Sequence, residues 1–186
     1  MKLKVAIFGS GDVSAGTMQK AAELGRELAK SGATIITGAC PGTPYITAEA
    51  AHKNGSEVWG FSPVQSLELQ RLETPDDDIS IYDKLIYIPR DFEFRDNVSI
   101  CYKYRNVLSA ATCDVGIIIS GKWGTLNEFT NLVDMGKTVG VLTGTGNVAD
   151  LIEDLVSKVH KPIRGGIVFD SSPEKLVKKV YETVKI

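Results

Sequence analysis

Short apolar runs and stretches with a helical period alternate along the whole chain. The apolar runs are rich in β-branched residues and carry apolar side chains on both faces, as do strands of a parallel sheet that is covered on both sides. The predicted strands are Val5–Phe8, Thr34–Thr37, Glu57–Phe61, Leu85–Ile88, Val115–Ile119, Val139–Leu142 and Ile167–Phe169. The predicted helices are Met18–Lys30, Ile46–Lys53, Asn97–Ala111, Leu126–Met135, Ala149–Lys158 and Pro173–Val184, the last with Ser171 or Ser172 as its N-cap. This alternation predicts one α/β domain over residues 1–186, with a doubly wound, mostly parallel sheet of about seven strands and helices on both faces.

One long connection interrupts this alternation. Residues Ser62–Lys84 contain Pro63, Pro75 and the acidic run Asp76–Asp78. Long connections in compact domains are often lids or binding loops. The alternative is a solvated excursion that carries a short helix around Leu67–Leu72, and the sequence leaves both interpretations open.

Composition narrows the class of protein. The fractions of hydrophobic (43%) and charged (24%) residues are typical of a globular chain, and the longest aliphatic run, Ile117–Ile119, is far short of the ~20 residues that a bilayer requires. A net charge of −2 argues against a broad basic surface for nucleic acid. Cys40, Cys101 and Cys113 lack the spacing of metal ligands or of a disulfide framework. With no leader segment before the first strand, we expect a reduced, cytoplasmic protein.

Glycine gathers where ligands bind in open parallel sheets, beyond the carboxyl ends of the strands. Nine of the 18 glycines lie at or just after a predicted strand end: Gly9, Gly11, Gly38, Gly42, Gly60, Gly121, Gly124, Gly144 and Gly146. Glycine-rich turns before helices expose backbone amides that can hold an anion. The first turn opens like a dinucleotide fingerprint but has Ser14 where the third glycine belongs, so we do not expect a classical dinucleotide site. Cys40 is interpreted as a small packing residue.

The turn from Ser120 to Glu128 is the most informative. The stretch 116–122 fits the phosphate-loop pattern GxxxxGK, but its spacer is strand core, and Trp123 stands where a serine or threonine should bind magnesium. Thr125 and Glu128 have the spacing of a capping box, which is one interpretation; the other is that both face a ligand.

Arg105 is the second candidate for chemistry. It shares a helix face with Val98, Cys101 and Leu108, and an arginine on a largely apolar face needs an anionic partner. That partner can be a glutamate or the phosphate of a ligand.

These residues carry a family resemblance. The chain resembles the LOG (LONELY GUY) superfamily of Rossmann-like nucleotide-binding proteins, often labelled "lysine decarboxylase-like", and above all its small prokaryotic branch related to molybdenum-cofactor carrier proteins. The family motif PGGxGTxxE corresponds to residues 120–128, its GGGxxGxM loop corresponds loosely to residues 37–44, and its arginine falls on Arg105. Ser120 and Lys122 replace the proline and the second glycine of the first motif, and Asn106 follows Arg105 where the family has lysine.

The resemblance implies hydrolysis of the N-glycosidic bond of a nucleoside 5′-monophosphate, giving a free base and ribose 5-phosphate, with Arg105 and Glu128 as catalytic residues. The residues implied to bind phosphate or nucleotide are Gly9, Ser10, Gly38, Gly42, Thr43, Gly121, Lys122, Trp123, Gly124 and Thr125. It also implies a homodimer, with no metal and no required cofactor. The alternative is a non-catalytic carrier of a nucleotide or of a phosphorylated pterin such as the molybdenum cofactor. Lysine decarboxylation is not expected, because the chain shows no recognisable site for pyridoxal phosphate.

Overall fold

A single parallel sheet forms the centre of the computed structural model, which describes residues 2–160 and 162–184. The seven strands lie in the order β4-β3-β2-β1-β5-β6-β7, and every neighbouring pair is parallel. Their bounds are β1 Lys4–Gly9, β2 Thr34–Thr37, β3 Val58–Phe61, β4 Lys84–Ile86, β5 Val115–Ile119, β6 Thr138–Leu142 and β7 Ile167–Asp170. The predicted strands and the doubly wound α/β class are confirmed.

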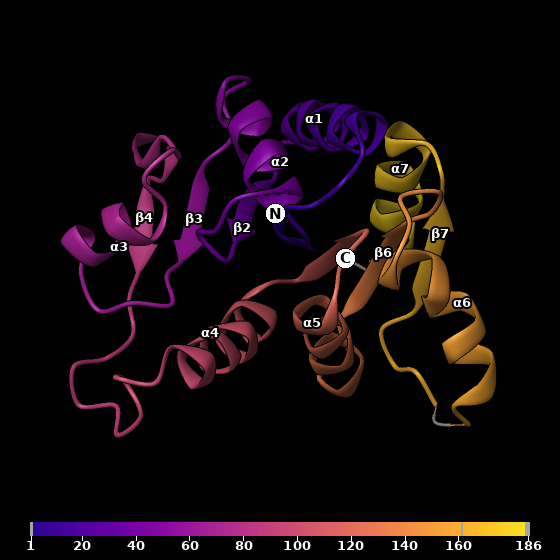
Figure 1. The fold of residues 1–186 in the computed structure, drawn as a ribbon. Coiled ribbons are helices and arrows are strands. Elements are labelled where there is room, and N and C mark those ends of the chain that lie inside the picture. The colour runs from indigo at the N-terminus through magenta and orange to yellow at the C-terminus, as the bar shows by residue number, and fades with distance from the viewer. Residues whose placement is uncertain (1, 161, 185–186) are drawn as a thin grey trace.

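Helices cover both faces of the sheet (Figure 1). On one face lie α1 (Ala15–Lys30), α2 (Thr43–His52) and α7 (Pro173–Thr183), and on the other lie α4 (Val98–Thr112), α5 (Trp123–Asp134) and α6 (Val148–Lys158). Alternate strand residues therefore enter two separate cores: Ile7 and Ile117 pack towards the first group of helices, whereas Phe8 and Ile118 pack towards the second. Among the described residues, no helix combines the length and apolarity needed to cross a bilayer.

The strand order reverses between β1 and β5. From β1 the chain builds outward through β2, β3 and β4, and from β5 it builds in the opposite direction through β6 and β7. The turns that leave β1 and β5 therefore diverge to opposite faces, which opens a crevice at the carboxyl edge of the sheet. The glycine-rich turns predicted from the sequence meet at this crevice.

Three helices begin three residues earlier than the apolar pattern predicts. The predicted starts were Met18, Ile46 and Leu126, whereas α1, α2 and α5 begin at Ala15, Thr43 and Trp123. The first turns of these helices are built largely from small or polar residues, which an apolar period does not detect. The predicted start of the last helix is confirmed, because the Ser172 side chain accepts a hydrogen bond from the amide of Lys175 and Pro173 follows as the first helical residue.

The long connection after β3 is solvated along much of its length and is anchored by a few buried residues. It contains the predicted short helix, α3 (Leu67–Glu73), and a 3₁₀ turn at Ile79–Ile81. Gln70 is fully buried, and its side-chain amide donates to the carbonyl of Ala39 at 2.9 Å. The connection is thereby tied to the turn that follows β2, beside the crevice.

The contact of α1 with α2 depends on Gly25. A Cβ atom at this position would lie 2.2 Å from the carbonyl oxygen of Thr47 and 2.9 Å from the Cβ of Ala50. We expect Gly25→Ala to lower the free energy of unfolding by about 1–3 kcal/mol, as overpacking does elsewhere. Urea denaturation measures this change.

Gly16→Ala is the matched control, because the nearest atom to a Cβ at Gly16 is 3.9 Å away and alanine favours helix. This control should be neutral or stabilising. Equal stability of the two variants would contradict the close packing of α1 on α2.

Candidate active site

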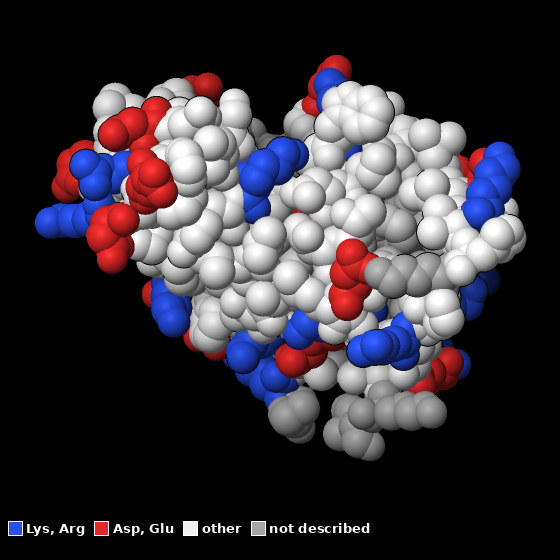
Figure 2. Space-filling view, turned by 90° about the horizontal axis from the view of Figure 1, so that it is seen from below, with Lys and Arg blue, Asp and Glu red and all other residues white. Residues whose placement is uncertain are grey.

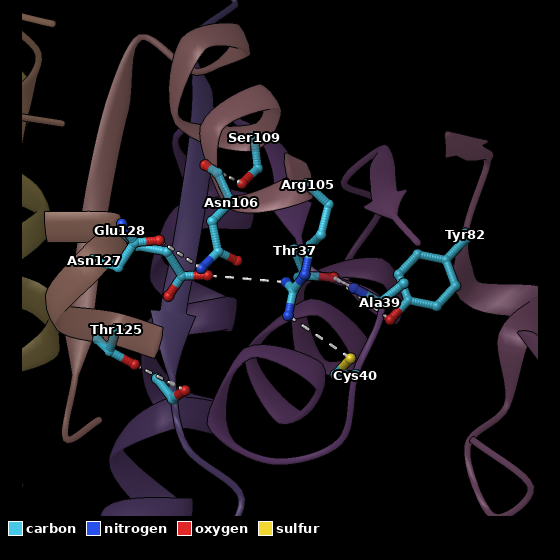
Figure 3. A network of polar contacts seen from close by, with 11 residues as sticks. Thr37, Ala39, Cys40, Tyr82, Arg105, Asn106, Ser109, Thr125, Asn127 and Glu128 are labelled. Atoms are coloured by element: carbon cyan, nitrogen blue, oxygen red, sulfur yellow. Dashed lines mark hydrogen bonds and ion pairs between the residues drawn. The ribbon is translucent and has the colours of Figure 1, made fainter. Parts of the chain in front are cut away.

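Arg105 of α4 and Glu128 of α5 face each other at the carboxyl edge of the sheet (Figure 3). Arg105 Nη1 lies 3.9 Å from Glu128 Oε1, and the two side chains are only 12% and 7% exposed. Of the two partners that the sequence left open for the arginine, the structure thus provides the glutamate. The pair is buried, so neither charge is screened by solvent as it would be on the surface.

The absence of a side chain at Gly38 leaves the space that the Arg105 guanidinium occupies. A Cβ atom on Gly38 would lie 1.2 Å from Arg105 Nη1, so the guanidinium lies directly against the backbone at the end of β2. Two other side chains lie beside Arg105. The centroid of the Tyr102 ring is 5.4 Å from Arg105 Cζ, and Cys40 Sγ is 3.9 Å from Arg105 Nη2. Its buried Nε has no hydrogen-bond partner among the described residues.

Cys40 is half-buried at this point and keeps its thiol protonated. Burial raises the pKa of Cys40, and the neighbouring Arg105 only partly opposes this rise. The position fits the interpretation of Cys40 as a packing residue beside the arginine.

The carboxyl of Glu128 titrates far from its ordinary range. Burial raises the pKa of Glu128 to about 7, against the opposing effects of Arg105 and then of Lys103. Near neutral pH both protonation states are therefore populated. A carboxyl in this state can accept or donate a proton during a reaction.

The N-terminus of α5 is open to an anion. Lys122, the N-cap residue, makes no side-chain capping hydrogen bond. The amides of Trp123, Gly124 and Thr125 have no acceptor among the described residues, as expected for the first turn of an uncapped helix. These amides and the positive end of the helix dipole favour a negatively charged group here.

Two neighbouring helix starts at this edge, those of α1 and α6, are partly occupied by the protein itself. The side chain of Ser14 caps α1 by accepting from the amide of Thr17. The first amides of α6, those of Val148 and Ala149, donate to the carbonyls of residues 121 and 120 at 3.2 and 3.0 Å. Among these three helices, α5 is the one in which none of the first three amides has an acceptor among the described residues.

Thr125 does not cap α5, so the capping-box interpretation is wrong. The helix begins at Trp123, and Thr125 is its third residue. The hydroxyl of Thr125 instead donates to the carbonyl of Gly9 at 3.1 Å, joining the start of α5 to the end of β1. This hydrogen bond fixes the start of α5 beside β1, and Glu128, one turn later on the same helix, therefore lies at the crevice.

Two further buried hydroxyls at this edge lack partners. Thr43 is fully buried at the start of α2, and its Oγ1 lies close enough to Gly9 that a Cβ there would be 2.1 Å away. Neither Thr43 Oγ1 nor Ser10 Oγ makes a hydrogen bond within the described chain. An unpaired buried hydroxyl costs free energy.

Two glycines shape the turns around these groups. Gly42 has a φ of +104°, and a Cβ there would lie 2.5 Å from the Cα of Gly11. Gly121 also has a φ of +104°, and a Cβ there would lie 2.5 Å from the Cβ of Thr125. A side chain at either position would be strained and would separate the turns that meet at the crevice.

Lys122 and Trp123 direct their side chains away from Glu128. Lys122 Nζ lies 3.4 Å from Asp12 Oδ2 in an exposed ion pair. The Trp123 side chain is 82% exposed and lines an apolar groove between α5 and α6 together with Leu151. Neither of these two predicted site residues lines the hollow that contains Glu128, whereas the adjoining Gly124 does.

A hollow of about 300 Å³ opens above the buried pair, a size at the lower end of the range for small-molecule sites. Its lining residues are Ser99, Tyr102, Lys103, Arg105, Asn106, Gly124 and Glu128. The sequence did not single out Ser99 or Lys103. The available signal was helical spacing, because positions 99, 102, 103 and 106 lie on one face of α4. In the part of the chain that the structure describes, no three His, Cys, Asp or Glu side chains cluster as metal ligands.

Comparison with known proteins places this arrangement in a family and in a widely shared fold. The family model described as the SLOG cluster4 family matches residues 2–177. A search of curated proteins finds no significant sequence match. The X-ray structure of TM1055, a structural genomics target, superposes with a TM-score of 0.77 at 23% identity over 98% of this chain and 99% of the other.

Two further solved structures share the fold at lower identity. The molybdenum cofactor carrier protein of Chlamydomonas reinhardtii matches with a TM-score of 0.70 and 19% identity over 98% of both chains. DNA processing protein A of Helicobacter pylori matches with a TM-score of 0.63 and 19% identity, over 98% of this chain and 82% of the other chain. At these identities the likeness establishes the fold alone, so function must be argued from the site.

The titration of Glu128 predicts how stability depends on pH. The pKa of this carboxyl is about 7 in the folded protein, against 4.5 for an ordinary glutamate. Between these values the unfolded chain has lost the proton that the folded chain retains. The free energy of unfolding should therefore fall by about 3 kcal/mol as pH rises through this window.

Glu128→Gln removes this dependence. Relative to the wild type, we expect the Gln variant to gain about 3 kcal/mol between pH 4 and pH 9 in urea unfolding. Glu153→Gln, an exposed substitution on α6, is the control. Parallel stability curves for wild type and Glu128→Gln would contradict the raised pKa.

Gly38→Ala tests whether the position of Arg105 depends on the absence of a side chain at residue 38. The new methyl group would displace the guanidinium, and Arg105 is the largest influence that lowers the pKa of Glu128. We therefore expect the pKa of Glu128 to rise above that of the wild type, as measured by carboxyl ¹³C NMR. Gly16→Ala should leave it unchanged, and an unchanged value in Gly38→Ala would show that Arg105 does not depend on this glycine.

Proposed function

Because the chain belongs to the SLOG cluster4 family and holds a buried glutamate beside an open helix N-terminus, we propose that it hydrolyses the N-glycosidic bond of a nucleoside 5′-monophosphate. The observation that carries this proposal is the Glu128 carboxyl, which titrates near pH 7 in the wall of a hollow that also reaches the start of α5. The products are a free base and ribose 5-phosphate.

In this proposal the phosphate group binds at the start of α5. The unpaired amides of residues 123–125 donate to its oxygens, and the helix dipole adds favourable electrostatic energy. The unpartnered hydroxyls of Ser10 and Thr43 lie at the same edge, with both oxygens buried within the protein. Backbone amides supply most of this site, which agrees with a net charge of only −2.

Glu128 acts on water and on the sugar. The carboxylate accepts a proton as the oxygen of water forms a bond to C1′ of the ribose. The bond from C1′ to the base nitrogen breaks, its electron pair leaves with the base, and the base nitrogen takes up one proton, which balances the proton that water gives to Glu128. Positive charge that builds on the sugar is stabilised by the negative carboxylate. Arg105 keeps a fraction of Glu128 ionised at neutral pH and orients it.

The charge distribution supports a small ligand over a nucleic acid. On the face shown in Figure 2, Lys and Arg side chains are interspersed with Asp, Glu and uncharged residues and form no broad basic patch. Binding along a nucleic-acid backbone relies on such patches.

A second candidate is a carrier that binds a nucleotide or a phosphorylated pterin without chemistry. The likeness to the molybdenum cofactor carrier protein over 98% of both chains favours it, as do Ser120 and Lys122 in the turn that would hold the phosphate. The same amides serve this function, and Glu128 would then contact the ligand without turnover.

Release of free base from AMP, GMP, IMP, CMP and UMP distinguishes the two candidates. We expect the wild type to cleave at least one of them and Glu128→Gln to lose activity by about 100-fold or more, because water loses its general base. The Gln variant should still bind the substrate, as a thermal shift with the nucleotide shows. Glu153→Gln is the control and should retain full activity.

Each outcome of these assays bears on one of the two candidate functions or on both. Cleavage that survives Glu128→Gln would overturn the assignment of this residue. Thermal stabilisation by a nucleotide or pterin phosphate without any turnover would favour the carrier, and no stabilisation by any phosphorylated compound would contradict both functions.

A further inference from the structure

The side chain of Asn106, a residue of α4, points towards α5 and contacts the carboxyl of Glu128. It is 2% exposed, and it follows Arg105 on α4 (Figure 3). One terminal atom of its side-chain amide lies 2.9 Å from Glu128 Oε1 and 2.9 Å from the backbone carbonyl of Tyr102. The other lies 3.1 Å from the side-chain amide of Asn127.

The two neighbours of the first terminal atom identify it as nitrogen. A carboxylate and a backbone carbonyl are both acceptors, and the NH₂ group of asparagine has two hydrogens to donate. The amide oxygen then faces the Oδ1 position of Asn127 at 3.1 Å, and the Asn127 amide must be turned over in the same way for its NH₂ group to donate to it. With both amides turned in this way, both ends of the buried Asn106 side chain are satisfied, as buried amides require.

Asn106 makes a closer contact with Glu128 than Arg105 does. The 3.9 Å from Arg105 Nη1 to Glu128 Oε1 is an ion-pair distance, too long for a hydrogen bond, whereas 2.9 Å from the Asn106 amide is ideal for one. No other described group donates a hydrogen bond to either oxygen of Glu128. We propose that Asn106 is a positioning residue that holds Oε1 of Glu128, so that Oε2 is the oxygen presented to the substrate.

This inference rests on the proposed function for the role of Oε2, but the hydrogen bond itself is independent of it. The charged groups that act on Glu128 are Arg105 and Lys103, both from α4, and the Cys40 thiol lies nearby on the turn after β2. Asn106 differs from Arg105 and Lys103 because it is neutral: it fixes the carboxyl without adding a charge that would keep Glu128 fully ionised.

Asn106→Leu tests the hydrogen bond directly by carboxyl ¹³C NMR. The ionised form of Glu128 loses its donor, so we expect the pKa of Glu128 to rise by about one unit or more above that of the wild type. Asn131→Leu, on α5, is the matched control: the Asn131 amide nitrogen is buried without a partner, so its loss should leave the titration of Glu128 unchanged. A shift in Asn106→Leu no larger than in this control would overturn the proposal.

Asn106→Asp keeps the test decisive if the leucine variant does not fold. Two carboxyls within hydrogen-bond distance share one proton, so Glu128 should titrate at a higher pH than in the wild type. An unchanged Glu128 titration in this variant would also overturn the proposal.

Kinetics then separate positioning from a general loss of structure. If the wild type cleaves a nucleotide, Asn106→Leu should lower kcat about tenfold or more at pH 7 and leave KM within about twofold. A loss confined to KM would contradict a role in holding the reacting carboxyl. If the wild type cleaves none of the nucleotides, the proposed function fails, while the NMR titration still decides the contact of Asn106 with Glu128.

Discussion

The cost of burying the Glu128 carboxylate governs the arrangement of the site. A buried charge is costly unless it is paired and hydrogen-bonded. Here Arg105 supplies the opposite charge and Asn106 supplies the nearest donor, both from α4. Arg105 can lie there only because Gly38 has no side chain. The result is a carboxyl that is neither firmly ionised nor firmly neutral near pH 7, which is the state that proton transfer requires.

The sheet topology brings these groups together from distant parts of the sequence. Because the strand order reverses between β1 and β5, the turns after these strands open a crevice, and α4 and α5 both flank it. The contact of Thr125 with the carbonyl of Gly9 fixes α5 to the end of β1. The fold is shared by a molybdenum cofactor carrier protein and by DNA processing protein A, which binds single-stranded DNA. The fold therefore supplies the crevice, and the side chains within it decide the chemistry.

The strands of the sheet and the pairing of Arg105 with an anionic group could be predicted from the sequence. The strands follow from runs of β-branched residues, and the need of Arg105 for an anionic partner follows from its apolar helix face. The capping-box interpretation of Thr125 failed because spacing alone does not show where a helix begins. The outward direction of the Trp123 side chain depends on how α5 packs against α6, which no local pattern encodes.

The contacts of Asn106 likewise depend on tertiary packing. The sequence shows that Asn106 adjoins Arg105, but its distance to Glu128 is set by how α4 packs on α5. Ser99 and Lys103 share its helix face, so helical spacing could have found them once the hollow was known to lie on that side.

The most direct test of the central claim is a crystal structure of Glu128→Gln bound to AMP. We expect phosphate density against the amides of Trp123, Gly124 and Thr125, with C1′ of the ribose facing residue 128. Phosphate density elsewhere on the molecule, with the start of α5 left without ligand, would contradict it.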